Sequence, residues 1–271
     1  MNIKEILKYI ILGIIQGFTE PIPISSSGHL LIIKRLLNTN EFNDINFEII
    51  VNFGSFLAIL FLYRKNIFKI IKDFINYIKT KENKYKDNYK YAILITIATI
   101  PAGILGLIFK DKIDYISNNI KLIGIALLIT SFALFLIKNE TGYKDKNKIN
   151  YKDAIFIGLF QAIALLPGIS RSASTIVGAM ICNFKKNVAV DFSFMLYLPI
   201  SIATFILGVK DLINMPNINS LIFFYLIGMI FSFIFTYLSA KWFLDIVKKG
   251  KLIYFSLYCL IIGILVVLFL N

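Results

Sequence analysis

Residues 16–30 read QGFTEPIPISSSGHL, and this polar stretch interrupts an otherwise apolar chain. It ends an apolar segment, 6–18, that is too short to span comfortably, since a bilayer-spanning helix needs about 20 residues. Pro21 and Pro23 should stop that helix, because proline lacks the N–H group and disfavours helix in the residue before it. The serines that follow are good N-cap residues for a second helix. The stretch therefore predicts a broken, re-entrant helical hairpin over 4–37.

The remainder of the chain has the composition of an all-α polytopic membrane protein. Of its 271 residues, 58% are hydrophobic and 17% are charged, whereas about 25% are charged in an average soluble domain. Continuous runs such as LIGIALLITSFALFLI do not alternate as barrel strands would. Apolar stretches long enough to span recur near 47–63, 90–109, 119–138, 189–209, 220–243 and 252–270. We expect six transmembrane helices there.

The net charge of +13 indicates membrane topology and contact with anionic lipid headgroups rather than nucleic acid. The Lys-rich stretch 64–90 reads as a solvated cytoplasmic loop with helical pieces. Cys182 and Cys259 lie in apolar surroundings, where cysteine usually behaves as a small buried hydrophobe. Neither cysteine indicates a metal site or a disulfide.

A second broken segment, AIFIGLFQAIALLPGISRSAST at 154–175, repeats the first one. A shift of 145 places Gly13, Gln16, Ser25, Phe47 and Ala58 on Gly158, Gln161, Ser170, Phe192 and Ala203. This order of matches predicts an internal duplication with halves 1–140 and 150–271. Each half would have one hairpin, 4–37 or 153–184, and three spans. Because three is odd, the second half is inverted, and the hairpins meet near the midplane, where broken helices form binding sites.

The distribution of basic residues tests this layout. Loops 64–90, 139–152, 184–188 and 244–251 carry 18 Lys and Arg residues, whereas 1–8, 34–46, 110–121 and 210–219 carry 8. By the positive-inside rule the first set is cytoplasmic, and both termini lie outside. If the short segments were full spans instead, the inversion would be lost and loops of the basic set would fall on opposite sides.

The first hairpin contains candidate reactive groups. Gln16 and Glu20 are four apart, so they share a helix face. His29, the single histidine, lies three residues after Ser26 and four after Ser25, which should bring its ring close to either hydroxyl. A free helix N-terminus is also a ready anion site. The structural alternatives are that the serines simply cap the helix and that Gln16 simply bonds a neighbouring helix. Glu, Ser and His together at a helix break favour a catalytic role instead.

The second hairpin supplies a cation. Arg171 is one of three arginines among 29 basic residues, and a planar guanidinium binds phosphate well. An arginine inside a membrane segment is expensive, so it marks a functional site, although a purely structural ion pair with Glu20 is an alternative. Thr175 lies four residues later and shares its face. Other polar candidates to cap the helix or line the site are Ser27, Asn52, Ser55, Ser170 and Ser172.

QGFTEPIPISSSGHL and LPGISRSAST closely resemble the two signature motifs of the bacterial undecaprenyl-diphosphate phosphatase family, known for bacitracin resistance. FEIIVNFGSFLAILFLYRK and DFSFMLYLP are also similar to that family, so the resemblance covers essentially the whole chain. It implies a cell-membrane hydrolase with six spans and two re-entrant helix pairs. Such an enzyme removes the terminal phosphate of undecaprenyl diphosphate and regenerates the carrier lipid for peptidoglycan, wall biogenesis and cell shape. A divalent cation, Mg²⁺ or Ca²⁺, is usually required.

The resemblance assigns roles by motif position. The family's acidic pair falls on Gln16 and Glu20, its serine on Ser26 and its histidine on His29. The second motif's serine, arginine and threonine fall on Ser170, Arg171 and Thr175. The expected catalytic set is Ser26, His29 and Glu20, and the expected phosphate ligands are Arg171, Ser170, Thr175, Ser25 and Ser27. Gln16, Asn52 and Ser172 support the site, and Glu20, with Gln16 as a second candidate, would bind the metal.

Two departures from the family pattern matter. Gln16 stands where many members have a second glutamate, which weakens a mechanism with two carboxylates on a metal. Pro21 replaces a bulky hydrophobe but removes no catalytic group.

Two questions stay open at this level. Ser26, His29 or water could be the nucleophile, with His29 as base or Glu20 acting through it. A secondary transporter or flippase for a lipid phosphate or small anion could use the same inverted scaffold; it would need no nucleophile. The oligomeric state is also open, with a homodimer as one candidate.

Overall fold

The computed structural model describes residues 3–36, 45–109, 116, 119–214 and 218–270. Much of the predicted loops 34–46 and 110–121, and part of 210–219, lies outside these residues. The described chain is helical, apart from short turns and one isolated bridge between Lys144 and Phe184. Its α-helices are α1 (Ile3–Thr19), α2 (Ser26–Leu36), α3 (Ile45–Thr80), α4 (Lys86–Ile108), α6 (Ile120–Leu136), α7 (Tyr151–Ile163), α8 (Arg171–Ile181), α9 (Lys186–Ile213), α10 (Ile218–Lys248) and α11 (Ile253–Phe269).

Each of the six predicted spans coincides with one of these helices. Four of them, α3, α4, α9 and α10, are long and apolar enough to cross a membrane. The other two, α6 and α11, are apolar but contain 17 residues each. The all-α, polytopic membrane fold class is therefore confirmed.

The expected loop at 64–90 is largely helical instead. Helix α3 continues to Thr80 and reaches 36 residues, or about 54 Å at 1.5 Å per residue. Aromatic side chains join this extension to α4: the ring centroids of Phe74 and Tyr77 lie 5.1 and 4.5 Å from that of Tyr89. The lysines had suggested a solvated loop, but lysine is a good helix former, and the aromatic contacts stabilise the pair.

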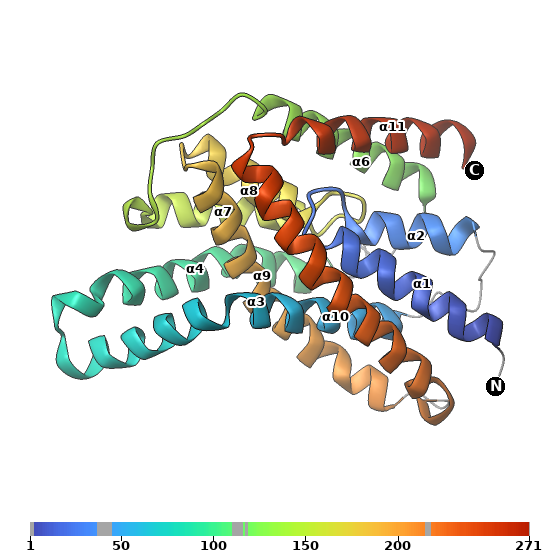
Figure 1. The fold of residues 1–271 in the computed structure, drawn as a ribbon, viewed down its shortest axis with the longest axis horizontal. Coiled ribbons are helices and arrows are strands. Elements are labelled where there is room, and N and C mark those ends of the chain that lie inside the picture. Colours follow the sequence, from blue (N-terminus) through green and yellow to red (C-terminus); the bar gives the residue numbers. More distant parts are fainter. Residues whose placement is uncertain (1–2, 37–44, 110–115, 117–118, 215–217, 271) are drawn as a thin grey trace.

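Figure 1 shows the arrangement of the two broken segments. Both termini lie at one end of the molecule, α1 and α2 extend towards that end, and α7 and α8 lie towards the other. Helix α1 packs closely on α10, because a Cβ on Gly13 or Gly17 would lie 2.4 Å from a carbonyl oxygen of Gly228 or Ser232. Such approaches through small residues are typical of membrane helices. They fix α1, and with it the side chains at its C-terminal end.

The break between α1 and α2 is anchored in the core. Residues 20–25 are not helical, and Ile22 and Ile24 are 1% and 4% exposed. Both belong to the large apolar cluster that also contains Ile176 of α8 and Phe192 of α9. The first motif is thereby held against helices of the second half of the chain.

Candidate active site

Two helix N-termini meet at the candidate site. Helix α2 begins at Ser26, and the Ser25 hydroxyl accepts a hydrogen bond from the Gly28 N–H at 3.3 Å. Helix α8 begins at Arg171, and the Ser170 hydroxyl accepts from the Ala173 N–H at 3.2 Å. The predicted serine caps are therefore present. The positive ends of both helix dipoles lie at the same place, which favours an anion.

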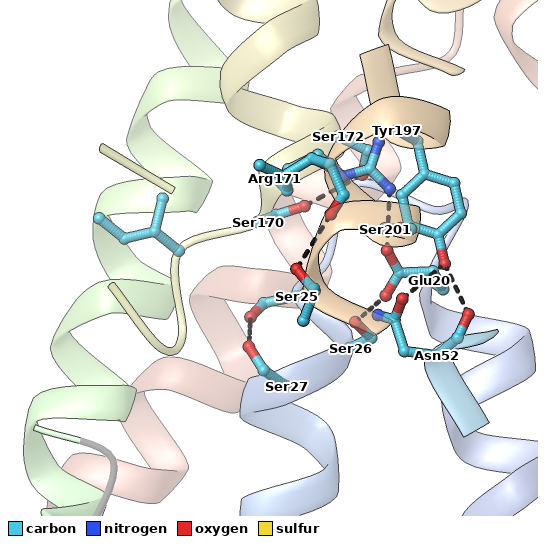
Figure 2. Close-up of a pocket in the computed structure, with 13 residues that line it drawn as sticks. Glu20, Ser25, Ser26, Ser27, Asn52, Ser170, Arg171, Ser172, Tyr197 and Ser201 are labelled. Carbon is cyan, nitrogen blue, oxygen red and sulfur yellow. Dashed lines mark hydrogen bonds and ion pairs between the residues drawn. The ribbon is translucent and has the colours of Figure 1, made fainter. Parts of the chain in front are cut away.

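A cavity of about 180 Å³ opens between these helix ends (Figure 2). Most of its lining residues have polar side chains, and they come from both halves of the sequence. The residues are Glu20, Ser25, Ser26, Ser27, Asn52, Ile169, Ser170, Arg171, Ser172, Tyr197, Ile200, Ser201 and Thr204. Of the predicted site residues, all but Gln16, His29, Ser55 and Thr175 line this cavity. Ser55 is completely buried and bonds to the Ser232 hydroxyl of α10 at 2.9 Å instead.

Glu20 connects the reactive groups. Its Oε2 accepts hydrogen bonds from the Ser26 hydroxyl and, at 3.1 Å, from the Gln16 amide. Its Oε1 lies 2.8 Å from Nη2 of Arg171. Figure 2 shows the carboxylate between the serine and the guanidinium. The predicted shared face of Gln16 and Glu20 is present, and Glu20, 9% exposed, has a charged partner as a buried carboxylate requires.

Arg171 is held on three sides. Besides the Glu20 contact, its Nη1 donates to the Ser193 carbonyl at 3.3 Å. Its Cζ lies 4.1 Å from the ring centroid of Tyr197, an arrangement that favours the cation. The Tyr197 hydroxyl in turn donates to the carbonyl and the side-chain oxygen of Asn52, at 3.0 and 3.1 Å. The guanidinium is therefore fixed in place at the cavity wall.

His29 is not where the spacing predicted. Its Nδ1 lies 2.7 Å from the Ser25 carbonyl oxygen and its Nε2 lies 2.9 Å from the Tyr258 hydroxyl. Both ring nitrogens are thus bonded to groups other than serine hydroxyls, and the ring, 8% exposed, does not line the cavity. The ring was expected close to the Ser25 and Ser26 hydroxyls, but the serine group that it bonds is the backbone carbonyl of Ser25.

Thr175 also differs from its predicted place as a phosphate ligand. Its hydroxyl bonds to the Arg171 carbonyl at 3.0 Å and to the Ser193 hydroxyl at 2.6 Å, and the residue is completely buried. Four residues into α8, a threonine hydroxyl bonds back to its own helix and here reaches α9 as well. Its contacts tie α8 to α9 beneath Arg171 and do not reach the cavity.

Comparison with known proteins agrees with these motifs. The family described as "Bacitracin resistance protein BacA" matches residues 9–265. The chain belongs to this family. It is 46% identical over 265 residues to Undecaprenyl-diphosphatase 1 of Bacillus cereus, with 98% of each chain covered. It is 44% identical to Undecaprenyl-diphosphatase 1 of Bacillus licheniformis, with 99% of this chain and all of the relative covered. It is 41% identical to Undecaprenyl-diphosphatase of Oceanobacillus iheyensis, over 99% and 98% of the two chains.

Several residues around the BacA-family site were missed from the sequence. Tyr197 and Ser201 line the cavity, and the Thr130 hydroxyl accepts from the Ser170 N–H at 3.1 Å. One signal was available for Tyr197: the shift of 145 places Asn52 on it, and these two counterparts bond to each other. Polar residues inside apolar helices carried no comparable signal for the others.

The donor set allows one kind of metal site in this BacA-family protein. Among the described residues that line the cavity, Glu20 is the one carboxylate. The described chain contains no group of three or more His, Cys, Asp or Glu residues that could hold an ion. An all-protein site therefore does not fit. A Mg²⁺ ion bound mainly through substrate phosphates and one carboxylate does fit, since Mg²⁺ is often bound that way.

The second half of the BacA-family scaffold has no counterpart of Glu20. The shift of 145 places Glu20 on Leu165 and Gln16 on Gln161. Gln161 is 1% exposed, and neither side-chain polar atom has a hydrogen-bond partner among the described residues. Gln161 is therefore buried without an acid partner like the one that Gln16 has in Glu20.

This unpaired amide leads to a stability prediction. Gln161→Met should raise the thermal stability of the detergent-solubilised protein by about 1 kcal/mol, because a buried polar group without partners costs about 1–3 kcal/mol. The measurement is the melting temperature by intrinsic fluorescence. The matched control, Gln16→Met, should bring no gain, because it removes the bond to Glu20. A lower melting temperature in Gln161→Met would contradict the assignment.

Proposed function

We propose that this protein is an integral membrane phosphatase that hydrolyses undecaprenyl diphosphate to undecaprenyl phosphate and inorganic phosphate. Membership of the BacA family and the names of relatives at 41–46% identity support this activity. The observation that carries it is the Glu20 carboxylate bonded to both Ser26 and Arg171 in one cavity. A carboxylate that can accept a proton, a hydroxyl that can attack phosphorus and a fixed cation that binds phosphate are the groups that hydrolysis of a diphosphate needs. The carrier lipid would be recycled for wall synthesis, with bacitracin resistance as a consequence.

The membrane arrangement that we propose has six spans and two re-entrant hairpins, in inverted repeats 1–140 and 150–271. The opposite placement of α1–α2 and α7–α8 in Figure 1 supports it. Helices α6 and α11, 17 residues each, are about 26 Å long, close to the 30 Å hydrocarbon core. The basic loops favour a bacterial cell membrane orientation with both termini outside. A homodimer stays a prediction.

The first step is exchange of partners at Arg171. The diphosphate headgroup binds between the two helix N-termini and takes the guanidinium from Glu20, with hydroxyls of Ser25, Ser27 and Ser170 as further donors. Once Arg171 bonds the phosphate, the Glu20 carboxylate is released from its ion pair and keeps its contact with the Ser26 hydroxyl. Substrate binding therefore leaves Glu20 free to accept the Ser26 proton.

In the second step Ser26 attacks the terminal phosphorus while Glu20 takes its proton. The bond from that phosphorus to the bridging oxygen breaks, and undecaprenyl phosphate leaves with the bridging oxygen and its electron pair. Glu20 passes the Ser26 proton to the departing undecaprenyl phosphate and is again a carboxylate. It then takes a proton from the water that attacks the phosphoserine phosphorus, and it returns that proton to the Ser26 oxygen as the phosphorus–serine bond breaks and inorganic phosphate is released. A divalent cation with Glu20 as its one carboxylate ligand would neutralise charge on the phosphates.

Phosphate release in detergent tests this function, because transport cannot occur without a membrane. Purified protein should release phosphate from undecaprenyl diphosphate, and Ser26→Ala should remove most of that activity. The absence of release with any divalent cation would overturn the phosphatase proposal and favour a transporter or flippase that needs no nucleophile.

The same assay gives a prediction for the metal. Chelation with EDTA should abolish phosphate release, because Arg171 is the one basic side chain among the described lining residues, whereas the diphosphate carries several negative charges and Glu20 adds another. Adding Mg²⁺ or Ca²⁺ back should restore it. Titration of each ion against the chelated enzyme measures this. Full activity after exhaustive chelation would remove the cation from the proposal.

A further inference from the structure

The turn before α2 has an unfavourable backbone conformation. Ser25, which immediately precedes Ser26, has φ +69°, in the left-handed region that non-glycine residues seldom adopt. Its counterpart in the second half, Ser170, has φ −73° and ψ 121° and caps α8 in the ordinary extended conformation. The strain is therefore specific to the half that carries Ser26, and something has to hold it.

Two hydrogen bonds from His29 restrain this turn. The Ser25 carbonyl accepts the backbone N–H of His29 at 3.2 Å and Nδ1 of its ring at 2.7 Å. Because a carbonyl can only accept, Nδ1 carries a proton, and in the neutral ring Nε2 is then the acceptor. At the counterpart of His29 in the unstrained cap stands Ser174. The histidine ring is present where the turn is strained and absent where it is not.

Tyr258 of α11 fixes the ring from the other side. Its hydroxyl lies 2.9 Å from Nε2 of His29 and can donate to it. The two rings are stacked, with centroids 5.5 Å apart and planes at 13°. Tyr258 does not line the cavity. Its hydroxyl therefore does not contact a substrate in the cavity directly, and the bond to His29 is the contact through which we expect it to act.

We propose that His29 and Tyr258 are positioning residues that hold the strained Ser25 turn and thereby direct the Ser26 hydroxyl at Glu20. This rests on the proposed phosphatase function. In this arrangement His29 is neither the nucleophile nor the base, since both its nitrogens are bonded away from the cavity. A displacement of Ser26 by about 1 Å can cost about 10²-fold in rate, so the pair matters without touching substrate.

Three substitutions of His29 separate positioning from proton transfer. In His29→Asn, Nδ2 occupies the place of Nδ1 and can donate to the Ser25 carbonyl, yet it cannot act as base or nucleophile. In His29→Gln the amide is one bond further out and misses that carbonyl. We expect the kcat of H29N to lie within about tenfold of the wild-type value. The kcat values of H29Q and H29A should lie at least about tenfold below that of H29N. Equal activities in all three variants, whether high or low, would overturn the proposal.

A double-mutant cycle tests Tyr258. Tyr258→Phe keeps the stacked ring and removes the hydroxyl, so kcat should fall several-fold with KM unchanged. In the H29N or H29A background, whichever is monodisperse on gel filtration, the same change should have no further effect, because the hydroxyl acts through Nε2. An equal loss in both backgrounds would show a packing effect and overturn the pairing. Wild-type protein and Ser26→Ala, assayed in parallel, test the phosphatase function separately.

Discussion

Glu20→Gln should lower kcat for undecaprenyl diphosphate by about 10²–10⁴, the range for loss of a general base. The amide has nearly the shape of the carboxylate but cannot take the Ser26 proton. Because Glu20 also pairs with Arg171, the change leaves the guanidinium without its resting partner and free for phosphate. KM should therefore stay the same or fall. Steady-state phosphate release at several substrate concentrations measures both quantities.

The matched control for this variant is Glu82→Gln. Glu82 also pairs with a basic residue, Lys84, at 2.7 Å, and the two side chains are 48% and 61% exposed; Glu82 does not line the cavity. Its replacement should leave kcat within about twofold of wild type, since exposed ion pairs contribute little to stability. A Glu20→Gln variant as active as this control would show that Glu20 does not activate Ser26.

Arg171→Ala should reduce kcat/KM by about 10³-fold or more. The phosphate loses a fixed cation, and removal of a single preorganised donor to transition-state charge typically costs about 10²–10³-fold in kcat; weaker substrate binding adds to this loss. Arg171→Lys should be intermediate, because an ammonium keeps the charge but cannot bond Glu20 and the Ser193 carbonyl with the same fork geometry. The measurement is phosphate release from monodisperse protein.

Arg64→Ala is the control, since Arg64 is exposed and bonds the Phe61 carbonyl of its own helix. It should behave as wild type. If Arg171→Ala turned over normally, the guanidinium would be a structural partner of Glu20 and the phosphate site would lie elsewhere.

Most of the helical architecture could be predicted from the sequence because it depends on local features. Proline placement marked the break at Pro21 and Pro23, and apolar length marked the spans. The extension of α3 to Thr80 could not be predicted in the same way. It depends on the contact of Phe74 and Tyr77 with Tyr89, which is a tertiary contact between two segments.

The candidate site shows the same difference between features set by local sequence, which could be predicted, and features set by tertiary contacts, which could not. Serine caps and the Gln16–Glu20 pair follow from spacing within one helix, and the structure contains them. The direction of the His29 ring depends on one backbone angle at Ser25, for which a non-glycine sequence carries no signal. The place of Tyr197 beneath Arg171 required knowledge of how α8 packs on α9.

The sequence has an acid at Glu20 but a leucine at the corresponding position 165, so the two halves are not chemically equivalent at the site. A scaffold built from two inverted copies could serve substrates equally from either face, as transporters do. The shift of 145 places Ser26 on Arg171. One residue carries a hydroxyl and the other a cation, and both bond the Glu20 carboxylate. In-line displacement requires the leaving oxygen opposite the attacking one. With Ser26 as the nucleophile that we propose, the lipid phosphate would depart on the side away from Ser26, and the reaction would have a single orientation in the inverted repeat that we propose.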